Sequence, residues 1–258
     1  MQLGVNIDHI AVLREARKIN DPDPMDALGV CKIAGADQIT IHLREDRRHI
    51  HDEDARKIIQ ESQLPINLEC SINESIIDIV LNLQPHRATL VPENRQEVTT
   101  EGGLDLINNF KYLEKIVPKL QKAGIDVALF IDPNPNMIEL AAKLKVDMIE
   151  LHTGKFANIY AMLYGGLNHT HHSIKTLELP RVILKKEFKK SIKELKRAAK
   201  FAKQLGLNVA AGHGINYQNI SYITNIKYIS ELNIGQSIVA RSVFTGLQKA
   251  IIDMKEKL

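Results

Sequence analysis

Residues 39–50 read Ile-Thr-Ile-His-Leu-Arg-Glu-Asp-Arg-Arg-His-Ile, an apolar alternation that runs into a charged loop. Alternate residues of a strand point to opposite faces, so the apolar positions share one face and Thr40, His42 and Arg44 share the other. The loop then adds two more arginines and His49. Arginine offers fixed forked donors to anions, and histidine titrates near neutral pH. The stretch predicts a strand with one chemically active face, although a solvated surface loop would have the same composition.

The bulk composition is that of an ordinary globular protein. The chain has 258 residues, of which 44% are hydrophobic and 25% charged, and its formal net charge is +3. This length suits one large α/β domain or two small ones. Cys31 and Cys70 lie in apolar stretches and form no disulfide framework, which predicts a reducing, cytoplasmic location.

No membrane or nucleic-acid partner is predicted. No window approaches the roughly 18 unbroken apolar residues of a membrane span. Much of the basic excess lies in residues 185–203, where the lysines occupy one face of an amphipathic helix pattern. The chain has no tryptophan, and this stretch does not interleave aromatics with a wide basic field, so we expect a solvated helix face.

Strand and helix patterns alternate along the whole chain. Helices are expected over 24–36, 52–63, 73–83, a stretch ending at 124, 136–145, 185–205, a short stretch after 214, and from 237 onward, with about thirty irregular residues before 185. Strands are expected over 3–9, 38–44, 66–70, 88–93, 126–132, 147–154, 208–214 and 229–235. This tally predicts one closed (β/α)₈ TIM barrel, a single domain spanning 1–258. A doubly wound open sheet is the alternative, but no Gly-x-Gly-x-x-Gly follows the first strand.

Ionisable residues gather at the ends of the predicted strands, where barrel active sites lie. Burying them unpaired would be costly, so their number there predicts an enzyme. The alternation also places Asn6 with Asp8, and Glu150 with His152, on shared inward faces. A partly dry glutamate such as Glu69 should have a raised pKa and exchange protons near pH 7. The strand ends carry Asp8, His9, His42, Arg44, Glu69, Glu93, Asp132, Glu150, His152, His213 and Gly235.

Phosphate is the expected handle on the substrate. Residues 212–214 and 233–237 place glycines and bare backbone N–H groups after the seventh and eighth strands, where barrels commonly hold phosphate. Either glycine cluster alone is also compatible with ordinary turn chemistry. Arg17, Arg44 and His49 are expected to neutralise a second phosphate at the opposite side of the barrel mouth, which predicts a bisphosphate or two phosphorylated substrates.

Metal binding is the rival interpretation. Asp8, His9, His42, Glu69, His152 and His213 include types that ligate divalent ions. The nearby arginines argue against a metal site, so none is expected. Residues 169–172 (His-Thr-His-His) are expected to form a surface loop. A metal-assisted sugar-phosphate aldolase or epimerase, and a non-catalytic phosphate-binding barrel, remain as alternatives.

Motifs over nearly the whole chain resemble the pyridoxine 5′-phosphate synthase family. The matching segments are 4–11 (Gly-Val-Asn-Ile-Asp-His-Ile-Ala), 42–49 (His-Leu-Arg-Glu-Asp-Arg-Arg-His), 67–69 (Asn-Leu-Glu), 91–93 (Val-Pro-Glu), 95–103 (Arg-Gln-Glu-Val-Thr-Thr-Glu-Gly-Gly), 150–154 (Glu-Leu-His-Thr-Gly), 211–214 (Ala-Gly-His-Gly) and 232–235 (Leu-Asn-Ile-Gly).

The resemblance implies a reaction and a set of roles. The family condenses 1-deoxy-D-xylulose 5-phosphate with 3-amino-2-oxopropyl phosphate to pyridoxine 5′-phosphate, phosphate and water, without metal or organic cofactor. His42 and Glu69 match its proton acceptors and His213 its proton donor. The deoxyxylulose phosphate site would comprise Asp8, His9, Arg44, His49 and Thr99. The aminoketone phosphate site would comprise Asn6, Arg17, Gly214, Gly235 and Gln236.

The family also implies additional helices on the barrel and a homo-octamer. The chain departs from the family at two places. Gln236 stands where the family commonly has histidine, so that contact would be made by a neutral donor. The segment 155–184 is longer than expected and has no assigned role.

Overall fold

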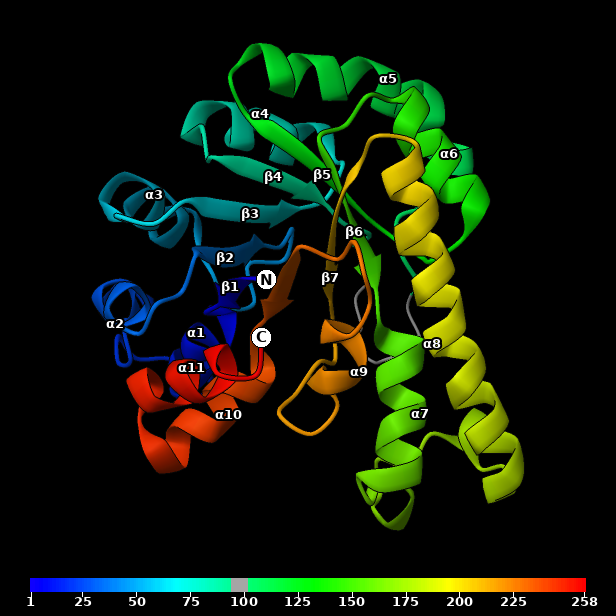
Figure 1. Ribbon diagram of the computed structural model, residues 1–258. Coiled ribbons are helices and arrows are strands. Elements are labelled where there is room, and N and C mark those ends of the chain that lie inside the picture. The colour runs from blue at the N-terminus through cyan, green and yellow to red at the C-terminus, as the bar shows by residue number, and fades with distance from the viewer. Residues whose placement is uncertain (94–101) are drawn as a thin grey trace.

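The computed structural model describes residues 1–93 and 102–258 and contains a closed barrel of parallel strands (Figure 1). The strands follow one another around the barrel in sequence order, and the last pairs with the first. They are β1 (Gln2–Asn6), β2 (Gln38–Leu43), β3 (Ile66–Cys70), β4 (Arg87–Leu90), β5 (Asp126–Ile131), β6 (Met148–His152), β7 (Asn208–Gly212) and β8 (Glu231–Ile234). The predicted (β/α)₈ TIM-barrel fold is confirmed.

Helices cover the outside of the barrel and connect its strands (Figure 1). They are α1 (Asp8–Arg17), α2 (Ala27–Ile33), α3 (Asp52–Glu61), α4 (Glu74–Leu83), α5 (Leu106–Lys122), α6 (Pro135–Lys143), α7 (Gly154–Tyr164), α8 (Arg181–Gln204), α9 (Ile220–Thr224), α10 (Gln236–Thr245) and α11 (Leu247–Lys255). Short 3₁₀ turns are η1 (Pro24–Asp26), η2 (Leu167–His169) and η3 (Lys175–Leu177). Helices beyond one per strand, such as α1 and α7, are the additional helices.

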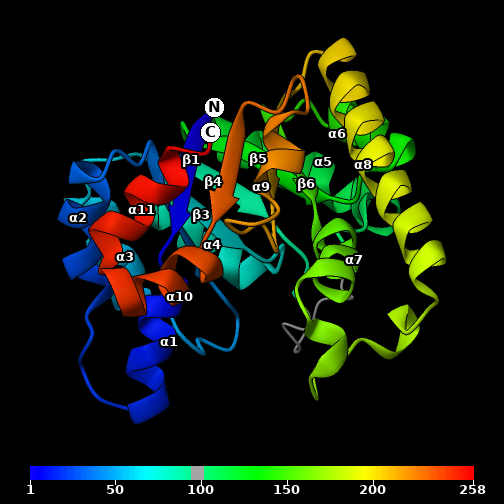
Figure 2. The same cartoon turned by 60° about the horizontal axis from the view of Figure 1, so that its bottom comes forward.

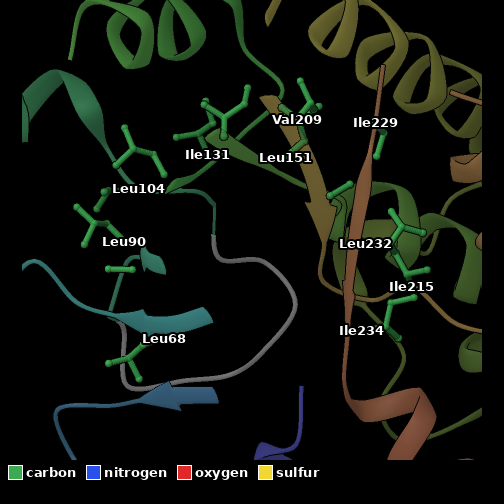
Figure 3. Close-up of a cluster of buried hydrophobic side chains, with 14 of the residues drawn as sticks. Leu68, Leu90, Leu104, Ile131, Leu151, Val209, Ile215, Ile229, Leu232 and Ile234 are labelled. Carbon is green, nitrogen blue, oxygen red and sulfur yellow. The ribbon is translucent and has the colours of Figure 1, made fainter. Parts of the chain in front are cut away.

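The main apolar core lies between the strands and the helices. Ile39, Ile41 and Leu43 of β2 are fully buried on the helix-facing side, and strand residues such as Leu68 and Leu151 belong to the same core cluster (Figure 3). Parallel sheets are stable when such an apolar face is covered by helices. The alternation read from residues 39–43 is therefore confirmed, and it turns Thr40 and His42 toward the barrel axis.

Polar side chains fill the barrel interior toward its amino-terminal end. Arg87 contacts both carboxylate oxygens of Glu231 at 2.8 and 3.0 Å, and Gln38 Nε2 donates to Glu231 Oε1 at 2.8 Å. Thr89 Oγ1 donates to Asn67 Oδ1 at 2.7 Å. Buried charges are tolerated only with such partners. These contacts place a buried ion pair in the half of the barrel away from the carboxyl ends of the strands.

The first strand is shorter than predicted. It ends at Asn6, and Asp8 and His9 belong to the first turn of α1 instead of the strand end. The sequence pattern missed α1 because its buried positions include Asp8 and Arg14, whereas Leu13 on the same helix is 49% exposed. An apolar stripe at helical spacing is the signal that identifies a helix, and α1 lacks one.

The stretch predicted to be irregular before residue 185 contains α7. Most faces of this helix are buried, so its sequence has no polar side to reveal the helical period. Phe156 of α7 stacks on Phe188 of α8 with ring centroids 5.4 Å apart, and Figures 1 and 2 show the two helices side by side. The segment 155–184 thus contains most of α7 and the start of α8, and these two helices pack against each other. The cluster at 169–172 is exposed after α7, as predicted.

The predicted C-terminal helix is two helices, α10 and α11, separated by Gly246. Gly246 has φ 77° and ψ 152°, a conformation that essentially only glycine adopts. We expect Gly246→Ala to lower the free energy of unfolding by about 1–3 kcal/mol, measured by urea denaturation. Gly29→Ala is the matched control, because Gly29 lies inside α2 with open space around its Cα; it should be neutral or stabilising. Equal effects of the two substitutions would contradict the strain at Gly246.

Within the described ranges, no helix combines the length and apolarity needed to cross a membrane.

Candidate active site

A cavity of about 470 Å³ opens at the carboxyl ends of the barrel strands. The predicted site residues that line it are Asn6, Asp8, His9, His42, Arg44, His49, Glu69, His213, Gly214, Gly235 and Gln236. Two predicted residues stand apart. Arg17 is exposed at the end of α1 and is not among the lining residues, and Thr99 lies outside the described residues.

His42 and Glu69 form the centre of the site. They are register partners on β2 and β3, and His42 Nδ1 lies 3.9 Å from Glu69 Oε2. Burial raises the pKa of Glu69 well above its usual value, and the negative charges of Glu150 and Asp8 raise it further. The predicted direction for this carboxyl is therefore confirmed. A carboxyl with a raised pKa keeps its proton to higher pH and is a stronger base once ionised, which suits a group that transfers protons.

Asp8 joins the first turn of α1 to β2. Its Oδ1 accepts from the backbone N–H of His42 at 2.9 Å, and its Oδ2 accepts from Asn6 Nδ2 at 2.8 Å. Asn6 Oδ1 in turn accepts from the backbone N–H of Asp8 at 3.0 Å. This closed set of bonds fixes the main chain that carries His42, so Asp8 also has a structural task in this site.

Two groups of anion-binding type lie on neighbouring sectors of the rim. Arg44 and His49 follow β2 and are almost fully buried, whereas Gly214 and Gly235 follow β7 and β8. In the closed barrel β1 separates β2 from β8, and β1 and β8 separate β2 from β7. The predicted placement on opposite sides of the mouth is therefore corrected: the groups lie two to three strand positions apart, whereas diametrically opposite strands would be four apart.

The glycine-rich corner after β7 and β8 brings backbone close to the cavity. A Cβ on Gly235 would lie 2.8 Å from Asn6 Cβ, so only glycine fits there. His213 and Gly214 both have left-handed φ values, 76° and 78°, and Thr153 Oγ1 donates to the carbonyl oxygens of Gly212 and His213. A non-glycine residue with a left-handed φ is uncommon, and such residues cluster at functional sites. Gln236 begins α10, whose N-terminus points its N–H groups at this corner.

Glu150 and His152 of β6 line the same cavity. The sequence pattern placed them on an inward face but gave them no role. Burial raises the pKa of Glu150 to about 7, although Asn233 Nδ2, which donates to Oε2 at 2.7 Å, favours the ionised form. His152 Nδ1 lies 3.1 Å from Asp132 Oδ1, and its ring meets that of His213 edge to face. The two-residue alternation was the signal that could have assigned both residues to the site.

No three His, Cys, Asp or Glu side chains in the described part of the chain converge as a metal-binding group.

The comparison with known families decides the affiliation of the chain. The family model described as "Pyridoxal phosphate biosynthesis protein PdxJ" matches residues 3–258. The chain belongs to the PdxJ family.

Curated relatives share the full length of this PdxJ-family chain. The pyridoxine 5′-phosphate synthase of Aliarcobacter butzleri (strain RM4018) is 68% identical over 256 residues, which cover 99% of this chain and 98% of the relative. The protein of the same name from Sulfurovum sp. (strain NBC37-1) is 59% identical over 258 residues and the full length of both chains.

Solved structures resemble the PdxJ-family barrel in fold alone. A phosphoribosyl anthranilate isomerase from Thermus thermophilus has a TM-score of 0.55 at 13% identity, covering 100% of this chain and 98% of that chain. A thiamine phosphate pyrophosphorylase from Pyrococcus furiosus has a TM-score of 0.55 at 11% identity, covering 99% and 94%.

Proposed function

We propose that this PdxJ-family chain is a pyridoxine 5′-phosphate synthase that condenses 1-deoxy-D-xylulose 5-phosphate with 3-amino-2-oxopropyl phosphate. The observation that carries the proposal is one cavity that Glu69 and His42 line together with two groups of anion-binding type. Two small phosphorylated substrates, each held by its phosphate at one of these groups, would have their carbon skeletons close together near the proton-transferring residues. The names of the full-length relatives support the same reaction.

The chemistry begins with the amine of one substrate attacking the ketone of the other. Loss of water gives an imine, and removal of a proton from carbon then allows phosphate to leave and the ring to close. Glu69 is proposed to supply and accept these protons because its pKa is raised by burial. His42 would serve as the second acceptor, and His213 would donate a proton to the departing oxygen.

Binding of the two phosphates is proposed to divide between the two groups. Asp8, His9, Arg44, His49 and Thr99 would hold the deoxyxylulose phosphate. The other phosphate would lie at the corner formed by Asn6, Gly214, Gly235 and Gln236, with Arg17 reaching it by a movement of its exposed side chain. Proximity of two bound anions would supply much of the rate.

Glu150 is proposed to share in the proton traffic. Its pKa of about 7 leaves it partly protonated at neutral pH. In its ionised form it can stabilise a positively charged group in the cavity, and in its protonated form a neutral one.

The chain is further proposed to act as one domain, in the cytoplasm, as a homo-octamer, in keeping with the family resemblance.

We expect turnover with both substrates and no added metal. Purified protein should form product that absorbs as a substituted pyridine, and a chelator such as EDTA should leave kcat unchanged. The control omits either substrate. Loss of activity on chelation, restored by a divalent ion, would favour a metal-assisted aldolase or epimerase. Binding of both phosphorylated substrates without product formation would favour a non-catalytic phosphate-binding barrel.

A further inference from the structure

Glu93 contacts His42 on the side away from Glu69. It follows β4, and its Oε1 lies 3.2 Å from His42 Nε2. The same oxygen accepts the backbone N–H of Glu45 at 3.2 Å, while Oε2 lies 3.8 Å from the guanidinium of Arg44. Only 10% of the Glu93 side chain is exposed. The carboxylate is thus held from two sides with one oxygen directed at the imidazole.

An ionised carboxylate can only accept hydrogen bonds, so its partner nitrogen must carry the hydrogen. Burial alone would raise the pKa of Glu93, but the hydrogen bond and the charge interaction with His42, followed by the charge of Arg44 and the backbone hydrogen bond from Glu45, bring this pKa below its usual value. Glu93 is therefore ionised at neutral pH. Neutral His42 then has its hydrogen on Nε2 and its lone pair on Nδ1, the nitrogen 3.9 Å from Glu69 Oε2.

We propose that Glu93 is a positioning residue that fixes the tautomer of His42, so that Nδ1 is the nitrogen that accepts a proton in the cavity. The proposal deepens the proposed function and rests on it for the role of His42. Aspartate in the Ser-His-Asp triad performs the same task for its histidine. Here the orienting carboxylate comes from the loop after β4, and β3 lies between that strand and β2, which carries the imidazole.

The other charged groups around His42 approach from different directions. Asp8 bonds the backbone N–H of His42, Glu69 faces Nδ1, and the His49 ring centroid is 6.2 Å from that of His42. These contacts do not determine whether Nε2 of His42 carries the hydrogen. Glu93 does, because its carboxylate contacts Nε2.

Glu93→Gln tests the proposal with almost no change of shape. If the amide oxygen replaces Oε1, the amide NH₂ faces the Arg44 guanidinium. If the NH₂ replaces Oε1, it meets the Glu45 N–H and donates to His42 Nε2, which demands the opposite tautomer. Both orientations contain a donor–donor contact, so the single tautomer should be lost.

The tautomer is read directly by ¹⁵N NMR of histidine-labelled, ligand-free protein, with the His42 signals identified by their absence in His42→Asn. Wild-type neutral His42 should show a protonated Nε2, and Glu93→Gln should show a mixture or a protonated Nδ1. We expect kcat to fall by about 10- to 100-fold, with KM for each phosphate changed by less than about threefold.

Glu45→Gln is the matched control, because it removes one negative charge from the loop after β2, next to Glu93, while its backbone N–H still donates to Glu93 Oε1. It should leave both the tautomer and kcat near wild type. A wild-type His42 protonated on Nδ1, or an unchanged tautomer in Glu93→Gln, would overturn the proposal, as would a loss of activity that lies mainly in KM. Absence of turnover in the wild-type protein would instead defeat the proposed function and leave the tautomer measurement valid.

Discussion

Glu69→Gln is expected to lower kcat by about 10³-fold, because the amide can neither give nor accept the protons that ring formation moves. Glutamine has the same size and can still hydrogen-bond, so the cavity should keep its shape. Inorganic phosphate and each substrate alone should therefore bind with nearly wild-type affinity, measured by calorimetry. Turnover within about tenfold of wild type would remove Glu69 from the mechanism.

The same substitution should make the fold more stable at neutral pH. Burial raises the pKa of Glu69 in the folded protein well above the ordinary glutamate value of 4.5, so between the unfolded and folded pKa values the folded state binds more protons than the unfolded state. Stability contributed by this group is complete below about pH 4.5 and is lost as the pH rises toward the folded pKa. Urea denaturation should therefore show that the advantage of Glu69→Gln over wild type grows from pH 4 to pH 8. If Glu69→Gln were inactive and became less stable relative to wild type as the pH rises, misfolding would explain its loss of activity.

Arg87→Met is expected to lower the free energy of unfolding by about 3–5 kcal/mol, the usual cost of leaving one member of a buried ion pair alone. Its partner Glu231 has a side chain only 2% exposed and would lose both 2.8 and 3.0 Å contacts. Methionine keeps most of the volume, so the effect is electrostatic. Urea denaturation with an unchanged m-value is the measurement.

Two further variants separate this cause from others. Glu231→Gln in the Arg87→Met background removes the uncompensated charge and should recover part of the loss. Lys119→Met breaks the exposed Lys119–Asp78 pair, whose side chains are 55% and 58% exposed, and should cost less than about 1 kcal/mol. A similar cost for Arg87→Met and Lys119→Met would contradict a buried ion pair in the barrel.

Local periodicity was sufficient to predict an element when all the residues on one of its faces pack against the same kind of surroundings. Ile39, Ile41 and Leu43 all pack against helices, so alternation alone located β2 and directed His42 inward. Helix α1 was missed because Asp8 and Arg14 are buried there by specific partners, namely His42 and Asp54. A buried polar residue is indistinguishable from an exposed one in the sequence until its partner is known.

The sequence by itself determined the alternating elements, the barrel, and the set of acids, bases and glycines at the strand ends, because these depend on spacing along the chain. The tertiary structure decided which of them meet. Barrel closure set the anion-binding groups two to three strand positions apart, turned α1 so that Asp8 holds β2, and placed Glu93 against His42. Such contacts join residues 34 and 51 positions apart, and their geometry and pKa shifts depend on burial and distance, which no local pattern encodes.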